Sequence, residues 1–263
     1  MSDDCRFINR TLAILKKKIY FISDVHLGAP ALNNNAEREQ LFVQWLEEIR
    51  HDAGMLFLMG DIFDYWFEYR KVVPRGFTRT LGKIAEIADS GIPVHFFTGN
   101  HDLWAFDYLP SELGVQVHHQ EVRMTISGKN FFLAHGDGLD PFDKGYRFMK
   151  KIFTNRFFQW AFAHVHPNLG IAIAHGWSKK SRVTKGNGEA FKEDREGLFV
   201  FAKSVLETEE VDYFVFGHRH LLLDLTIAKK SHFIILGDWI NYFSYGVFDG
   251  EKFELKTYKN TVD

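Results

Sequence analysis

The sequence predicts an α/β fold built around a largely parallel sheet, and three observations support this class. In the first hundred residues, three short apolar runs alternate with two segments of helical periodicity, which is the order of a βαβαβ unit. Each apolar run ends in a polar or glycine-containing turn, as strands do where they leave a sheet. The composition is that of a folded globular chain, because 46% of the 263 residues are hydrophobic and 25% are charged.

The elements of the N-terminal half follow one another without long linkers. The apolar runs are four to six residues long, as buried strands are, and the periodic segments carry apolar residues three or four apart. In chain order we expect a strand at 18–23, a helix at 36–51, a strand at 55–59, a helix at 78–90 and a strand at 93–97.

Shorter strands dominate the C-terminal half. A hairpin turn at Ser127–Lys129 separates two strands, and a helix-rich stretch separates these from three more. We therefore expect a short N-terminal extension at 1–17 and one main domain at 18–263, interrupted by a helical cap insertion at about 141–192. The expected strands of this half are 122–126, 131–134, 213–216, 221–227 and 232–236.

The charge of the chain is unevenly distributed. The net charge is -2, which excludes a global cationic surface for nucleic acid. Residues 144–192, however, hold ten basic residues and one acid, a net charge of +9, whereas the remainder carries 22 basic and 33 acidic residues. The same segment holds nine aromatic residues, in a chain whose aromatic share is 16%. We therefore expect an anionic, apolar ligand beside this segment and no nucleic acid.

Two further features bear on the compartment. Cys5 is the single cysteine, so an intramolecular disulfide and a cysteine-based zinc cluster are excluded. No run of about 18 apolar residues is present, and the polar residues within 157–177 make that stretch unsuited to crossing a bilayer. We expect a cytoplasmic protein, associated peripherally with the cytoplasmic face of the inner membrane.

Five polar motifs each follow a predicted strand. Ligands gather beyond the carboxyl ends of strands in open α/β sheets, so these motifs are expected to meet. Carboxylate, imidazole and amide oxygens without thiolates favour Mn, Fe or Zn in a nitrogen and oxygen site. The motifs are Asp24-Val-His26, Gly60-Asp61, Gly99-Asn-His-Asp102, His135-Gly-Asp137 and Gly217-His-Arg-His220.

The order of these motifs resembles that of the calcineurin-like metallophosphoesterases over nearly all of 18–258. The resemblance implies a four-layer αββα sandwich and two divalent ions, with Mn²⁺ preferred and Fe or Zn as alternatives. It implies that Asp24, His26 and His220 bind one ion and that Asp61 bridges the pair. The implied ligands of the other ion are Asn100, His135 and His218.

The same resemblance assigns catalytic roles beside the metals. We expect His101 to donate a proton or a hydrogen bond to the phosphoryl or leaving oxygen. Asp102 is expected to orient the ring of His101. An alternative is that Asp102 caps the short helix that follows.

Longer stretches resemble one branch of that superfamily, the UDP-2,3-diacylglucosamine pyrophosphohydrolases of lipid A biosynthesis. The resemblance implies a metal-dependent hydrolase that cleaves the diphosphate of UDP-2,3-diacylglucosamine to UMP and 2,3-diacylglucosamine 1-phosphate. These stretches are Phe21–Leu27, Leu58–Trp66, Leu133–Asp137 and Leu236–Trp239. The implied substrate contacts are Asn100, His101, Asp143, Ser178, Arg182, Lys185 and His218.

Two positions depart from that branch. Arg182 stands where we expect Asn, and His101 stands where the branch usually has Arg. His101 therefore leaves open a metallophosphodiesterase that acts on another nucleotide or nucleotide-linked lipid. A third alternative is a scaffold that binds a partner without catalysis, although all seven metal-ligand positions are filled.

An amphipathic helix is predicted within the insertion, with an apolar stripe from Met149 to Ala161. The stripe can hold acyl chains, or it can pack the insertion onto the main domain. Basic residues flank it, and basic amphipathic helices bind anionic membrane surfaces. The expected partners are therefore a nucleotide-linked lipid and an anionic membrane.

Overall fold

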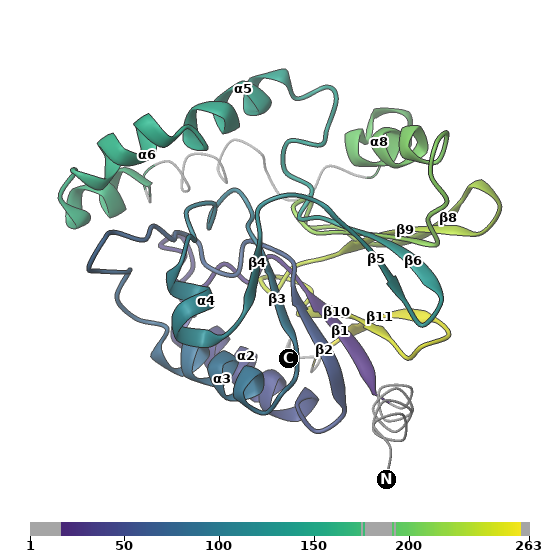
Figure 1. Cartoon of the computed structure of the whole chain (residues 1–263), viewed down its shortest axis with the longest axis horizontal. Helices are drawn as coiled ribbons and strands as arrows, with labels where there is room; N and C mark the ends of the chain where they lie inside the picture. Colours follow the sequence, from purple (N-terminus) through teal and green to yellow (C-terminus); the bar gives the residue numbers. More distant parts are fainter. Residues whose placement is uncertain (1–16, 175, 177–190, 192, 259–263) are drawn as a thin grey trace, which may run out of the picture.

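Two facing β-sheets form the centre of the protein (Figure 1), in a computed structural model that describes residues 17–174, 176, 191 and 193–258. The first sheet has the order β11-β10-β1-β2-β3-β4, and β1 to β4 run parallel. Its strands are β1 (Lys18–Ile22), β2 (Ala53–Leu58), β3 (Val94–Phe97), β4 (Gln116–His118), β10 (Ser244–Phe248) and β11 (Phe253–Thr257).

The second sheet has the order β5-β6-β7-β9-β8, and its three central strands run parallel. The two outer strands, β5 and β8, are antiparallel to their neighbours. The strands are β5 (Val122–Ile126), β6 (Lys129–Leu133), β7 (Tyr213–Phe216), β8 (Leu222–Ile227) and β9 (Ser231–Leu236).

Helices cover the outer face of each sheet, which gives the predicted four layers. Three helices pack on the first sheet: α2 (Asn35–Ile49), α3 (Thr78–Asp89) and α4 (Tyr108–Leu113). Helix α8 (Gly197–Val205), preceded by the short η1 (Glu193–Arg195), packs on the second, where η2 (Ala228–Lys230) joins β8 to β9. The predicted α/β class is confirmed, and so is the parallel order of the N-terminal strands. The antiparallel β10 and β11 were not predicted.

Aromatic side chains fill the space between the two sheets. The ring of Phe21 on β1 stacks on Phe57 at 4.8 Å and lies 6.0 Å from Phe131 of the opposite sheet. Facing sheets lie about 10 Å apart, so large flat side chains fill the gap efficiently. The high aromatic content therefore serves the core, in addition to the insertion.

The segment predicted to be an insertion begins with two helices that lie across the carboxyl ends of the strands (Figure 1). They are α5 (Lys144–Phe153) and α6 (Arg156–Ala163), and residues 167–174 are also helical. The single helix predicted from Met149 to Ala161 is wrong, because Asn155 has an extended backbone and its side chain caps α6 by accepting from the Phe157 N–H. No helix in the described ranges is long and apolar enough to span a bilayer.

A buried histidine pair joins β3 to β4 and makes stability depend on pH. His95 is 4% exposed, and its Nδ1 lies 2.9 Å from Nε2 of His118. Burial, and to a smaller degree His118, lowers the pKa of His95 to about 4. An unfolded histidine has a pKa of about 6.5, so the unfolded state takes up a proton first as the pH falls. The contribution of His95 to the free energy of unfolding is therefore complete above pH 6.5 and is lost as the pH falls towards 4.

We expect the free energy of unfolding at pH 5 to be about 2 kcal/mol lower than at pH 7.5 because of His95 alone. Urea denaturation of the wild type and of His95→Gln at both pH values, at equal metal content, measures this. The variant should show a flatter dependence on pH, whatever its stability at pH 7.5. Equal pH dependence in the two proteins would contradict the assignment.

Candidate metal centre and catalytic site

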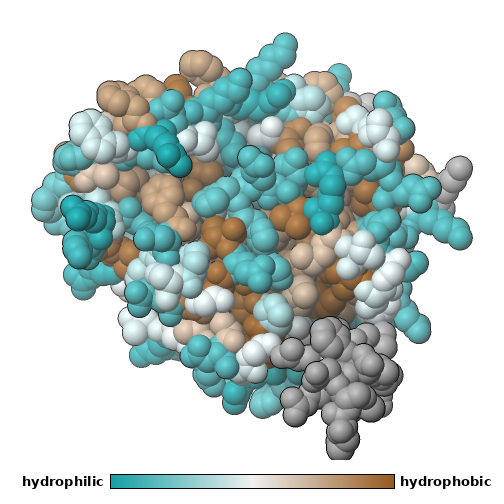
Figure 2. Space-filling view, in the orientation of Figure 1, coloured by the Kyte–Doolittle hydropathy of each residue, from teal (hydrophilic) through white to brown (hydrophobic). Residues whose placement is uncertain are grey.

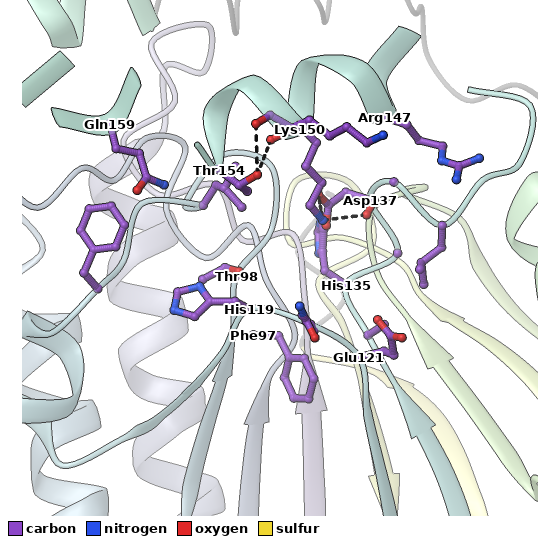
Figure 3. Close-up of a pocket in the computed structure, with 18 residues that line it drawn as sticks. Phe97, Thr98, His119, Glu121, His135, Asp137, Arg147, Lys150, Thr154 and Gln159 are labelled. Carbon is purple, nitrogen blue, oxygen red and sulfur yellow. Dashed lines mark hydrogen bonds and ion pairs between the residues drawn. The ribbon is translucent and has the colours of Figure 1, made fainter. Parts of the chain in front are cut away.

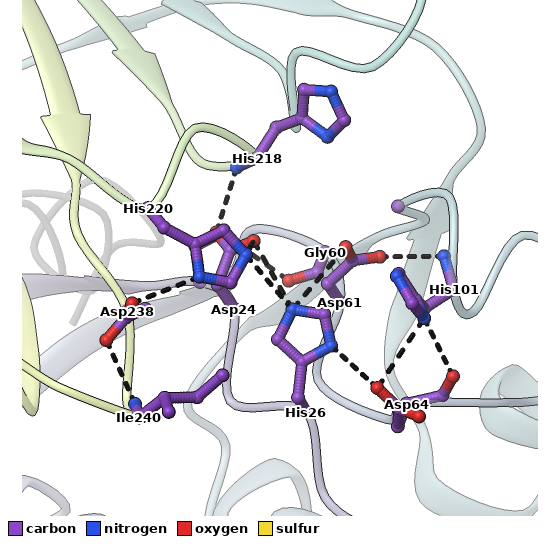
Figure 4. Close-up of polar contacts among 12 residues, drawn as sticks. Asp24, His26, Gly60, Asp61, Asp64, His101, His218, His220, Asp238 and Ile240 are labelled. Atoms are coloured by element: carbon purple, nitrogen blue, oxygen red, sulfur yellow. Dashed lines mark hydrogen bonds and ion pairs between the residues drawn. The ribbon is translucent and has the colours of Figure 1, made fainter. Parts of the chain in front are cut away.

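The five predicted motifs meet at one edge of the sandwich, where the parallel strands of both sheets end. Figure 4 shows side chains from four of them, and Figure 3 shows His135 of the fifth. The first sheet supplies the loops after β1, β2 and β3, and the second supplies those after β6 and β7. Backbone bonds join neighbouring loops within each sheet, because the Asp24 N–H donates to Gly60 O and the Gly217 N–H donates to His135 O. The two sheets are joined where the His218 N–H donates to Oδ2 of Asp24 at 2.9 Å. The sequence prediction that these motifs converge is therefore confirmed.

The loop backbone at this edge is strained. Five of the seven expected ligands have a positive φ, a region that residues other than glycine rarely adopt. Such strain persists only where the surrounding structure imposes it, and it clusters at functional sites. The five residues are Asp24 (φ 56°), His26 (φ 48°), Asp61 (φ 53°), His218 (φ 69°) and His220 (φ 50°).

One cluster of ligand atoms is formed by Asp24, His26 and His220, whose atoms lie within 4.8 Å of one another. Nε2 of His220 lies 3.3 Å from Oδ1 of Asp24 and 3.3 Å from Nε2 of His26. Two imidazole nitrogens and a carboxylate oxygen that share one point form a ligand set for a divalent cation.

A second cluster is formed by Asp61, His135 and His218, again within 4.8 Å. Oδ2 of Asp61 lies 3.3 Å from Nε2 of His135 and 3.8 Å from Nε2 of His26. The Asp61 carboxylate therefore stands between the two clusters, as a bridging ligand must.

Three buried atoms test whether cations fit this site. Oδ1 of Asp24, Oδ1 of Asn100 and Nε2 of His135 have no hydrogen-bond partner among the described residues. An unsatisfied buried polar group costs about 1–3 kcal/mol. All three atoms belong to expected metal ligands, so coordination removes this cost and the site fits two cations.

The pKa values show that the site requires positive charge. Burial lowers the pKa of His135, but the Asp61 carboxylate outweighs it and raises the pKa to about 10. Burial lowers the pKa of His26 too, yet the carboxylates of Asp24 and Asp64 raise it to about 9. Burial alone would raise the pKa of Asp61, but His135 and His101 hold it well below its usual value. In the metal-free protein, protons on His26 and His135 thus balance carboxylates that divalent ions would otherwise neutralise, whereas burial lowers the pKa of His218 to about 3.

Outer hydrogen bonds fix the orientation of the ligand histidines. Nδ1 of His26 lies 3.2 Å from Oδ1 of Asp64, and Nδ1 of His220 lies 3.0 Å from Oδ2 of Asp238. An acceptor at Nδ1 leaves the Nε2 lone pair directed at the metal position. Asp64 and Asp238 lie within the stretches that resemble the pyrophosphohydrolases, but sequence reasoning assigned them no role.

His101 lies at the rim of this site, with its side chain 18% exposed. Its Nδ1 donates to the Asp64 carbonyl oxygen at 2.9 Å and lies 3.6 Å from the Asp64 carboxylate. Its backbone N–H donates to Asp61 at 2.8 Å. Burial lowers the pKa of the His101 ring, although Asp61 opposes this.

The prediction that Asp102 orients this ring is wrong. Asp102 is fully buried, and its carboxylate accepts from the backbone N–H groups of Gly99 at 2.7 Å and Ile62 at 2.8 Å. Burial and the nearby Asp61 raise the pKa of Asp102 to about 7. Asp102 therefore joins the loops that follow β2 and β3, and Asp64 holds the His101 ring.

Helix α5 is attached to the loop that follows the ligand His135 (Figure 3). Oδ2 of Asp137 lies 2.7 Å from Nζ of Lys150 and accepts from the Tyr146 hydroxyl at 2.8 Å. Asp137 is 5% exposed, so both contacts exclude most water. This attachment fixes α5 beside the second metal cluster.

The predicted substrate contacts are only partly visible. Asn100, His101 and His218 lie at the metal site, as described above. Asp143 is exposed and caps α5, where its Oδ1 accepts from the Tyr146 N–H at 2.8 Å. Ser178, Arg182 and Lys185 lie outside the described residues.

Comparison with known proteins identifies the family of this chain. The sequence profile of the calcineurin-like phosphoesterases matches residues 17–222. A UDP-2,3-diacylglucosamine hydrolase from Porphyromonas gingivalis is 45% identical over 257 residues, which cover 92% of this chain and 98% of that protein. A hydrolase of the same name from Histophilus somni is 27% identical and covers 85% of this chain and 92% of its own. Among solved structures, a dimetal phosphatase from Danio rerio is 15% identical, with a TM-score of 0.46, and covers 93% of this chain and 99% of its own. The chain belongs to the calcineurin-like phosphoesterase family, a family of metal-dependent enzymes, and among its curated relatives are UDP-2,3-diacylglucosamine hydrolases.

Proposed function

We propose that this protein hydrolyses the diphosphate of UDP-2,3-diacylglucosamine to UMP and 2,3-diacylglucosamine 1-phosphate. The assignment of the substrate rests on the 45% identity to a curated UDP-2,3-diacylglucosamine hydrolase, of which this chain covers 98%. The site supports the reaction class, because its two ligand clusters share the Asp61 carboxylate.

We assign one ion to Asp24, His26 and His220, with Asp61 between the ions. Asn100, His135 and His218 are assigned to the other ion. Nitrogen and oxygen ligands without thiolate suit Mn²⁺, and they also accept Fe or Zn. When bound, a pair of divalent ions supplies an activated water and neutralises charge on the transferred phosphoryl group.

The residues of the chain position and protonate the substrate. His101 contacts the phosphoryl or leaving oxygen, because its Nδ1 is held by Asp64 and its Nε2 remains for the substrate. With both ring nitrogens protonated, His101 donates to the leaving group. Asn100 and His218 contact the diphosphate from the metal side. Asp143, Ser178, Arg182 and Lys185 are the proposed contacts of the insertion with the substrate.

The test is hydrolysis of UDP-2,3-diacylglucosamine by the purified protein loaded with Mn²⁺, followed by ³¹P NMR. UMP and the acylated sugar 1-phosphate should accumulate in equal amounts, and cyclic nucleotides and bis-p-nitrophenyl phosphate should be poorer substrates. Preferred cleavage of one of those diesters would select the alternative substrate class that His101 leaves open. A protein that binds neither ion and cleaves nothing would be a scaffold.

The exposed apolar side chains of the protein concentrate on the insertion. Apart from Val72 and Tyr242, every large hydrophobic side chain that is strongly exposed in the described ranges lies between 142 and 173. Phe157 is 65% exposed and Trp160 60% exposed. Figure 2 shows apolar and hydrophilic side chains side by side over α5 and α6. The described residues from 144 to 174 include five basic residues and no acid.

We infer that this surface binds the anionic cytoplasmic face of the inner membrane, where a diacylated substrate resides. The double variant Phe157→Ser/Trp160→Ser is expected to bind phosphatidylglycerol vesicles at least about tenfold more weakly, because each buried aromatic ring contributes roughly 1.5–3 kcal/mol. Co-sedimentation measures this, with Val72→Ser, 50% exposed elsewhere, as the matched control. Unchanged vesicle binding with a higher KM for the diacyl substrate would instead assign these rings to the acyl chains.

A further inference from the structure

A cavity of about 670 Å³ lies between helix α5 and the loops that follow β3, β4 and β6 (Figure 3). The metal-cluster residue His135 lines one part of it, together with Asp137. His119 and Glu121, in the loop after β4, line another part. A volume of this size is within the range of small-molecule sites. The cavity is therefore large enough for a small-molecule ligand and reaches the metal-cluster residue His135.

Helix α5 turns a basic face toward this cavity. Arg147, Lys150, Lys151 and Thr154 all line it, and their spacing places them on one face of the helix. Lys150 is paired with Asp137. Arg147 and Lys151 form no ion pair with any described residue, so two cationic side chains are available to an anionic ligand.

The remaining lining is mixed, because Leu103, Ala134 and Leu139 stand beside several polar side chains. His119, Gln120, Glu121 and Gln159 present hydrogen-bonding groups, and apolar rings are confined to Phe97 and Phe106. Covering such groups with an alkyl chain removes their water without replacing their hydrogen bonds, which is unfavourable. A ligand with a phosphate, hydroxyl groups and a flat ring satisfies them. Of the two halves of a nucleotide-linked lipid, only the nucleotide combines a phosphate and hydroxyl groups with a flat ring.

We propose that this cavity binds the nucleoside 5′-monophosphate half of the substrate, an inference that rests on the proposed function. The phosphate lies at the His135 end and is neutralised by Arg147 and Lys151. The ribose hydroxyls donate to Glu121, and the base contacts the polar groups around His119. The lipid half of the bound substrate then extends from the metal centre in another direction. Arg147, Lys151 and Glu121 are thus residues that determine nucleotide affinity.

The test measures UMP binding to the Mn²⁺-loaded protein by isothermal titration calorimetry. Arg147→Ala/Lys151→Ala is expected to weaken UMP binding at least tenfold and to raise KM for UDP-2,3-diacylglucosamine with little change in kcat. The matched control is Lys144→Ala/Arg156→Ala, which removes one lysine from α5 and one arginine from the neighbouring α6, both outside the cavity, and should leave the Kd for UMP within twofold. The Glu121→Gln variant should bind UMP more weakly, and its preference for UMP over 2′,3′-dideoxy-UMP should be smaller than that of the wild type.

UMP binding requires no turnover, so it separates this inference from the proposed function. A protein that fails to cleave the lipid nucleotide but binds UMP through Arg147 and Lys151 would retain the cavity assignment and lose the substrate. Wild-type affinity in the double variant would overturn the assignment. Binding of inorganic phosphate as tight as that of UMP would overturn it too. So would binding of 2,3-diacylglucosamine 1-phosphate that is weakened equally by loss of Arg147 and Lys151.

Discussion

Replacement of Asp61 by Asn is expected to lower kcat at least about 10³-fold, the largest effect of any single change described for this protein. The Asp61 carboxylate stands between the two ligand clusters, 3.3 Å from Nε2 of His135 and 3.8 Å from Nε2 of His26. An amide places a neutral oxygen there, so the charge that holds both ions is lost. Two-metal stabilisation is worth several kcal/mol, and about 4 kcal/mol corresponds to 10³-fold in rate.

The measurement is the rate of UMP release at saturating Mn²⁺, together with metal content by mass spectrometry. The matched control is Asp89→Asn at the exposed end of α3, which should keep full activity. Chelation of the wild type should abolish activity, and added Mn²⁺ should restore it. An Asp61→Asn protein that holds two ions and retains a tenth of the wild-type rate would refute the bridging assignment.

The convergence of the metal clusters could be predicted from the sequence because each motif is short and directly follows a strand. Parallel neighbours end at the same edge, so knowledge of three strands was enough to bring Asp24, Asp61 and Asn100 together. The assignment of each ligand to an ion came from the family resemblance and not from spacing.

The residues that orient the ligands could not be predicted in this way. Asp102 is next to His101 in sequence, but its side chain turns inward to the backbone of the preceding loop. Asp64 and Asp238 reach their histidines only through the tertiary fold, at separations of 38 and 18 residues. Hydrophobic periodicity does not encode such contacts. It also failed at Asn155, where a local side-chain cap divides one predicted helix into α5 and α6.

Gly99→Ala is expected to lower kcat by about 10²-fold and the free energy of unfolding by about 1–3 kcal/mol, although it adds a single methyl group. A Cβ at Gly99 would overlap the Asp61 carboxylate and approach the Asp61 backbone nitrogen to 2.7 Å. Rotation of the Asp61 side chain cannot relieve the clash between the new Cβ and the Asp61 backbone nitrogen, so the loop after β2 must move. That movement also disturbs Asp102, which accepts from the Gly99 N–H at 2.7 Å.

Gly82→Ala on α3 provides the matched control for Gly99→Ala, because an added Cβ there meets nothing within 4 Å. Alanine is the better helix former, so this control should gain about 0.5–1 kcal/mol and keep full activity. Urea denaturation and UMP release measure both proteins under the same conditions. Wild-type turnover in Gly99→Ala would mean that the position of the Asp61 carboxylate tolerates displacement, which a ligand shared by two ions does not. Loss of turnover with stability retained would place the whole effect on the metal centre.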